Sequence, residues 1–148
     1  MESGPVDVEI RWPDIDGYGH VSHMALVAIA EHGRSRWLDA TLGIRPATWP
    51  YVVVRLEVDF RQPAEFLDRS IRCHYKAVRV GSKSVGLEEL YTGPDDTVLF
   101  EVRSVIVAWD QEGAVARTLT EEEVTRLTPA PCAPGLSTGE AGNPNAIL

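Results

Sequence analysis

Cysteine, basic charge and long apolar runs are all scarce in this sequence of 148 residues. Its two cysteines, Cys73 and Cys132, are too few and too far apart for a metal cluster, so we expect a reducing compartment and no disulfide. The formal net charge of -8 excludes a general nucleic-acid binder, which would normally be basic. The chain shows no apolar run near the length of a membrane span and no secretory leader pattern. These absences predict a cytoplasmic protein that binds neither nucleic acid nor membrane.

What remains is the composition of an ordinary folded domain, with 44% hydrophobic and 24% charged residues. At this length we expect one domain with its own core. Residues 129–148 are rich in proline and glycine and poor in large apolar side chains, which predicts a disordered tail without a catalytic role. The folded domain is therefore expected over residues 1–128.

One long helix is expected early in the chain. Residues 6–11 alternate between apolar and polar, which predicts a half-buried strand that Pro13 ends, because proline cannot donate to a sheet. Ser22 is a suitable N-cap and Gly43 a suitable stop for a helix of roughly 18 residues. Gly33 in mid-helix costs about 1 kcal/mol against alanine, which indicates close packing on a sheet.

The later part of the chain predicts an antiparallel sheet. Apolar residues recur at every second position from Tyr51 onward, with turn residues between the runs, which indicates four more strands in hairpin succession. Thr120 and Glu123 form a capping box for a short last helix. The fold class is therefore α+β, with a curled sheet of about five strands wrapped around one long central helix. Because such a sheet keeps exposed edges, we expect a homodimer or a tetramer.

An acidic turn with two histidines stands directly before the long helix. Asp14, Asp16, His20 and His23 form the densest group of side chains able to do chemistry. A calcium loop is excluded, because Ala25 stands where a bidentate glutamate is required and no helix precedes the turn. A phosphatase with Asp14 as nucleophile is disfavoured, because it needs a parallel sheet with repeated crossover helices. The third interpretation, a hydrolytic site for an acyl thioester, is implied by the family resemblance described next. Asp14 and His20 are assigned to stabilising the turn.

This pattern resembles the 4-hydroxybenzoyl-CoA thioesterase-like branch of the hotdog superfamily, over roughly residues 6–127. The resemblance implies a hotdog fold and the hydrolysis of acyl-CoA or acyl-carrier-protein thioesters. It implies no metal and no cofactor, with coenzyme A entering only as part of the substrate. The residues and segments that carry the resemblance are Asp16, Gly17, Gly19, His23, Glu31, Arg34, 60–64 and 80–87.

Asp16 and the start of the helix are the expected catalytic elements. The resemblance gives Asp16 the role of nucleophile or of general base for water, and the sequence leaves both routes open. Backbone N–H groups of His23, Met24 and Ala25 would hold the negative charge that develops on the carbonyl oxygen. The imidazole of His23 would orient water or carry a proton. The alternatives are an Asp16 that only braces its turn through an Asx hydrogen bond and a merely solvated His23.

Substrate contacts are expected from other segments. The hairpin of Ser82, Lys83 and Ser84 corresponds to the one that lies near the pantetheine and phosphates of CoA in the family, and its alternative role is a polar turn. Trp12 stands where relatives often carry tyrosine, so it keeps an aromatic wall without the hydroxyl. Arg61 belongs to the matching strand ending and is assigned to substrate binding. We expect the active site at a subunit interface, with the hairpin supplied by the second protomer.

Three further alternatives stay open. The segment of residues 55–83 has a net charge of +3, which suits a small anionic ligand or simply a solvated strand face. Glu31 and Arg34 either line the pocket or pair with each other along the helix. The rival function is a non-catalytic acyl-CoA-binding protein with the same fold. A dehydratase is disfavoured, since the later strands lack a hydratase-type Asp/His pair.

Overall fold

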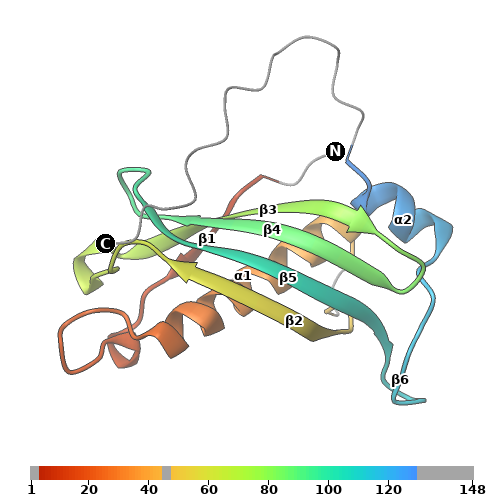
Figure 1. The fold of residues 1–148 in the computed structure, drawn as a ribbon, viewed down its shortest axis with the longest axis horizontal. Coiled ribbons are helices and arrows are strands. Elements are labelled where there is room, and N and C mark those ends of the chain that lie inside the picture. The colour runs from red at the N-terminus through yellow and green to blue at the C-terminus, as the bar shows by residue number, and fades with distance from the viewer. Residues whose placement is uncertain (1–3, 45–47, 130–148) are drawn as a thin grey trace, which may run out of the picture.

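A curled antiparallel sheet surrounds one long helix in the computed structural model, which describes residues 4–44 and 48–129 (Figure 1). Apart from Pro129, the predicted tail lies outside these residues, as does Cys132. The strands are β1 (Val6–Glu9), β2 (Tyr51–Phe60), β3 (Ser70–Val80), β4 (Ser84–Thr92), β5 (Val98–Asp110) and β6 (Val115–Ala116). The helices are α1 (His23–Leu42), α2 (Glu121–Leu127) and the 3-10 turns η1 (Trp12–Asp14) and η2 (Phe66–Asp68).

The strand order is β1-β3-β4-β5-β2, with the short β6 paired to β5. This confirms the predicted α+β hotdog arrangement, in which a curled antiparallel sheet wraps one helix. The predicted hairpin succession is right for β3, β4 and β5 but wrong for β2, which pairs with β5 at the far edge. The reason is that β1 already occupies the position beside β3, so the chain crosses one end of the sheet between β2 and β3.

Helix α1 is capped as its sequence predicts. The Ser22 hydroxyl accepts from the Ala25 N–H at 3.1 Å, and Gly43 ends the helix in the left-handed conformation. The close packing expected at Gly33 is confirmed, because a Cβ there would overlap the Tyr75 hydroxyl and lie 3.2 Å from Cys73 Sγ. Neither α1 nor any other helix in the described ranges is long and apolar enough to cross a membrane.

The two edges of the sheet are unequal. Edge strand β1 is short, and the Arg36 guanidinium of α1 donates to its Asp7 carbonyl at 2.8 Å. Edge strand β2 is longer, and its inward side chains are exposed, Leu56 by 39% and Phe60 by 49%. Their register partners on β5 are buried on the inner face of the sheet, so the side chains of Leu56 and Phe60 point to the same face. They stay uncovered because α1 packs mainly against β1 and β3. A bulge after Val53 further interrupts this strand.

Candidate active site

The loop that carries Asp16 closes tightly on itself. Asp16 N–H donates to the His20 carbonyl at 2.8 Å, and Gly19 N–H donates back to the Asp16 carbonyl at 3.1 Å. Gly19 has a φ of +83°, a conformation that glycine adopts without strain. One step further out, Ile15 and Val21 form an antiparallel bridge. The loop is therefore a narrow closed hairpin that ends at the first residue of α1.

The carboxylate of Asp16 has one engaged oxygen and one that is available. Oδ1 accepts from the N–H groups of Tyr18 at 2.9 Å and of His20 at 3.3 Å, so the Asx bond considered from the sequence is present. Within residues 4–44 and 48–129, Oδ2 has no hydrogen-bond donor. Asp16 is half-buried. Bracing the loop and presenting an oxygen to a ligand are thus compatible roles of one side chain.

The N-terminus of α1 follows immediately and offers two backbone donors. The N–H groups of His23 and Met24 have no acceptor in the described part of the chain, whereas Ala25 N–H already donates to Ser22 Oγ. Of the three N–H groups predicted to hold an oxyanion, those of His23 and Met24 are therefore available and that of Ala25 is not. These N–H groups and the helix dipole favour a negative charge at this position.

The side chains of His23 and Met24 are exposed beside the end of β2. The His23 ring meets Phe60 edge-on, with 6.5 Å between ring centres, and Met24 is 67% exposed. Phe60 in turn packs on buried Phe100. The candidate site thus borders the uncovered apolar side of β2.

Two predicted substrate contacts, Trp12 and Arg61, lie outside the loop that carries Asp16. Trp12 is 74% exposed in η1 and packs edge-on against Phe66 at 5.6 Å, so it supplies an aromatic surface on the neighbouring turn. Arg61 follows the end of β2 and its Nε donates to Glu101 at 2.9 Å. Arg61 also lines a groove of about 540 Å³ on the outer face of the sheet, away from α1.

That outer groove decides between the two roles considered for the basic segment. Its basic side chains are interleaved with carboxylates on the neighbouring strands, so the groove has no excess of positive charge. Register pairs place Lys76 opposite Glu88 and Glu88 opposite Arg103. The arrangement favours a solvated strand face over an anion site. The charged side chains on this outer face of the groove are Asp59, Arg61, Lys76, Glu88, Glu101 and Arg103, whereas the Glu89 carboxylate is turned to the buried side of the sheet.

The hairpin of Ser82, Lys83 and Ser84 lies at the opposite end of the sheet. Ser82 carbonyl accepts from Leu119 N–H at 2.8 Å, close to α2, and Ser84 pairs with Val107 of β5. The loop before α1 instead lies with the end of β2 at the other end of the molecule (Figure 1). Within one chain, therefore, the fold does not bring this hairpin to Asp16.

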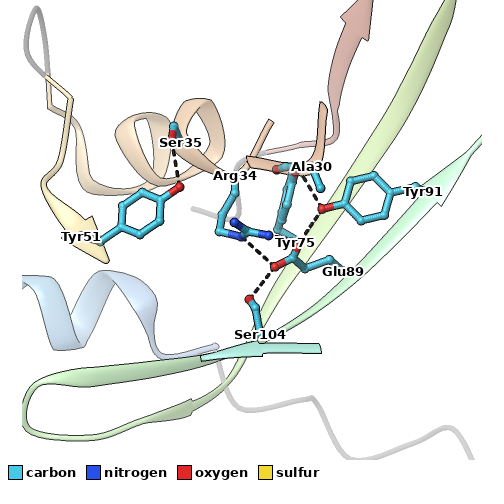
Figure 2. Close-up of polar contacts among 8 residues, drawn as sticks. All are labelled: Ala30, Arg34, Ser35, Tyr51, Tyr75, Glu89, Tyr91 and Ser104. Carbon is cyan, nitrogen blue, oxygen red and sulfur yellow. Dashed lines mark hydrogen bonds and ion pairs between the residues drawn. The ribbon is translucent and has the colours of Figure 1, made fainter. Parts of the chain in front are cut away.

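A buried ion pair beneath α1 was missed by the sequence reasoning. Arg34 Nε and Nη2 donate to the two carboxylate oxygens of Glu89 at 2.8 and 2.9 Å, as Figure 2 shows. Ser104 Oγ donates to the same carboxylate at 2.6 Å, and the Tyr91 hydroxyl donates to its other oxygen. The alternative of an Arg34–Glu31 pair is wrong, because Glu31 is exposed on another face of α1.

This network is fully satisfied and closed to solvent. Burial alone would lower the pKa of Arg34, but the hydrogen bonds and charge of Glu89 outweigh it and raise the pKa, so the guanidinium stays charged. Burial and the charge of Glu89 raise the pKa of Tyr91, which keeps its hydroxyl a neutral donor. Burial likewise raises the pKa of the Cys73 thiol to about 12. These groups stabilise the contact of α1 with the sheet rather than face a ligand. In the described ranges, His, Cys, Asp and Glu side chains form no cluster that could hold a metal ion.

The sequence matches the family model of the "Thioesterase-like superfamily" over residues 10–134. Solved structures of similar fold include a thioesterase superfamily protein from Jannaschia sp. CCS1, with 21% identity, coverage of 85% of this chain and 93% of that one, and a TM-score of 0.76. A thioesterase from Thermus thermophilus, complexed with coenzyme A and Zn, has 24% identity, coverage of 83% and 90%, and a TM-score of 0.66. A predicted thioesterase from Bacillus stearothermophilus has 19% identity, coverage of 84% and 92%, and a TM-score of 0.73. No curated protein matches the sequence. At these identities the solved structures show a shared fold.

Proposed function

Because the chain belongs to the thioesterase-like superfamily, we propose that it hydrolyses the thioester of an acyl-CoA. The observation that carries the proposal is that one hydrogen-bonded loop connects Asp16 to the start of α1. One carboxylate oxygen of Asp16 is available, and the N–H groups of His23 and Met24, which have no acceptor among the described residues, follow this loop in the first turn of α1. Thioester hydrolysis needs an attacking oxygen and a place for negative charge, and this stretch offers both.

Two routes use these groups. In the first, Asp16 attacks the carbonyl carbon, the C–S bond breaks, and CoA leaves as a thiolate that takes a proton from water. The resulting mixed anhydride is then hydrolysed. In the second, Asp16 takes a proton from the water that attacks the carbonyl carbon, and the C–S bond then breaks so that CoA leaves as a thiolate that takes up a proton. In both, the backbone N–H groups of His23 and Met24 donate to the oxyanion, and the exposed His23 ring orients water or carries the proton.

We propose a homodimer formed through β2. Its long edge carries exposed Val54, Leu56 and Phe60, whereas the other edge is short and covered in part by Arg36. An antiparallel pairing of two β2 strands about a two-fold axis sets the Tyr51 end of one beside the Phe60 end of the other. The hairpin of the partner, which lies at the Tyr51 end, would then reach the side of the sheet where Asp16 lies.

Sedimentation of the wild type and two lysine variants tests this dimer. Leu56→Lys puts a charge on the exposed inner side of β2 and should yield monomers with lowered activity. Val78→Lys, at a residue 49% exposed on β3, is the matched control and should leave the dimer intact. A monomeric wild type, or a dimer that tolerates Leu56→Lys, contradicts the proposed interface.

The proposal extends to the carrier of the thioester, the branch of the superfamily and the polarity of the acyl group. The Thermus relative was solved with coenzyme A, which supports a CoA ester here, and acyl-carrier-protein thioesters are the second carrier class to include. Placement in the 4-hydroxybenzoyl-CoA thioesterase-like branch, and action in the cytoplasm, stay predictions. The exposed apolar side of β2 beside His23 favours an apolar acyl group over a charged one.

Thiol release from a panel of acyl-CoAs tests the function, with wild type, Asp16→Asn and Asp95→Asn side by side. Asp16→Asn keeps an acceptor for the loop N–H groups but removes the charge, so kcat/KM should fall at least about 100-fold, about 3 kcal/mol of barrier. Asp95 makes the same kind of Asx bond, to Thr97 N–H, and its variant should keep full activity. Equal activity in all three proteins would mean that Asp16 is not the attacking group. Binding of CoA esters without any hydrolysis would favour the non-catalytic alternative.

A further inference from the structure

We propose that Asp14 is a positioning residue for this hydrolysis, acting through the hydrogen-bonded loop that connects Asp16 to the start of α1. The inference rests on the proposed function, because it concerns the geometry that Asp16 needs. Asp14 does not itself face the candidate site. Its side chain is 6% exposed and turned back toward Arg11, beyond the end of the first strand.

The carboxylate of Asp14 is held by one residue. Arg11 N–H donates to Oδ2 at 2.7 Å, and the Arg11 guanidinium donates to Oδ1 at 3.1 Å. A buried carboxylate without such donors is strongly disfavoured, so Asp14 stays fixed against Arg11. This closes η1 as a rigid turn between β1 and the loop.

The backbone of Asp14 holds the start of α1. Its carbonyl accepts from the N–H of Ser22, the N-cap residue, at 2.9 Å. Asp14 therefore joins the end of the first strand to the first turn of the helix. Asp16 follows two residues later, and His23 directly follows Ser22. A displacement of Asp14 shifts both sides of the candidate site relative to each other.

Catalysis is sensitive to such a shift. Reacting atoms must approach to about 3–3.5 Å, and a misplacement of about 1 Å can reduce the rate on the order of 100-fold. Substrate affinity depends on contacts from other segments. Loosening Asp14 should therefore lower kcat and leave KM nearly unchanged.

The test compares Asp14→Asn with Asp68→Asn. Asp68 makes the matching bond in η2, where its Oδ2 accepts from Glu65 N–H at 2.8 Å, but its backbone carbonyl has no bond to the start of α1. We expect Asp14→Asn to lower kcat at least about tenfold with KM changed by less than about threefold, and Asp68→Asn to leave both nearly unchanged. Equal effects of the two substitutions, or no loss with Asp14→Asn, overturn the proposal. If Asp14→Asn fails to fold, Arg11→Met, which removes only the guanidinium, should show a smaller loss of the same kind.

A double-mutant cycle with Asp16→Asn separates positioning from general weakening. If Asp14 acts through Asp16, adding Asp14→Asn to Asp16→Asn costs no further activity. An independent loss, multiplied onto that of Asp16→Asn, overturns the assignment.

The ring-proton NMR signals of His23, which lies against Phe60, report the same geometry without activity. They should shift in Asp14→Asn and stay unchanged in Asp68→Asn. If the wild type hydrolyses no thioester, the proposed function fails, and these signals alone decide the positioning. Unchanged His23 signals in Asp14→Asn then refute it.

Discussion

Removing Glu89 alone should destabilise the protein far more than removing Glu89 together with Arg34. In the folded protein both side chains are almost without exposure, at 0% and 2%. Each charge is neutralised by the other through two hydrogen bonds. The substitution Glu89→Leu would leave the Arg34 guanidinium buried, charged and without its partner.

The magnitude follows from what each variant leaves behind. Breaking a buried ion pair by removing one partner costs about 3–5 kcal/mol. Arg34→Met combined with Glu89→Leu removes both charges and leaves the hydroxyls of Ser104 and Tyr91 without their acceptor, about 1 kcal/mol each at the low end. We therefore expect about 2 kcal/mol for the double variant. The two single effects together should exceed the double effect by about 4 kcal/mol or more.

Urea unfolding of the wild type, the two single variants and the double variant at neutral pH measures this coupling. The matched control is the exposed pair of Arg61 and Glu101, where Glu101→Leu should change the free energy of unfolding by less than about 1 kcal/mol. A cost below about 1 kcal/mol for Glu89→Leu would refute the reasoning. Additive effects of the two single substitutions would refute it equally.

Two further predictions follow from shifted pKa values. Burial raises the pKa of Cys73 to about 12. In the Cys132→Ser protein, whose one cysteine is Cys73, a thiol reagent at mildly alkaline pH should therefore label Cys73 only after unfolding in urea. Labelling of the folded protein would contradict the packing of Cys73. The hydrogen bond from Arg117, aided by the Trp49 indole, lowers the pKa of Glu123 from 4.5 to about 2. The contribution of Glu123 to stability is therefore complete above pH 4.5 and is lost as the pH falls toward about 2. In Glu123→Gln the urea midpoint should depend less on pH over that interval than in the wild type. An equal pH dependence in the two proteins would contradict the assignment.

Features encoded within a few residues could be predicted from the sequence. The two ends of α1 could be predicted because Ser22 and Gly43 cap the helix through contacts within a few residues. Close packing at Gly33 could be predicted because glycine destabilises a helix interior, so its presence there indicates a neighbour that leaves no space for a side chain. The loop of Asp16 was located for the same reason, since its turn residues and the helix start are neighbours in the chain.

Features that depend on register could not be predicted. The alternation of Val85, Leu87, Glu89 and Tyr91 does place Glu89 on the buried face, and this signal was available. Its partner Arg34 lies on α1. Whether Arg34 pairs with Glu89 or with Glu31 on its own helix depends on how α1 packs on the sheet, which the sequence does not give. The place of β2 at the sheet edge, and the distance of the hairpin of Ser82 from Asp16, are likewise set by strand order.

The closed loop before α1 also bears on how such a protein can diversify. Under the proposed function, every group that acts on the thioester lies in residues 14–24, a stretch that closes through its own hydrogen bonds. The surfaces that would meet the rest of the substrate belong to β2 and to the hairpin at the far end of the sheet. Substitutions there can change which acyl group is accepted while the hydrolytic stretch is inherited intact. Reaction chemistry and substrate preference can then evolve separately within one small domain.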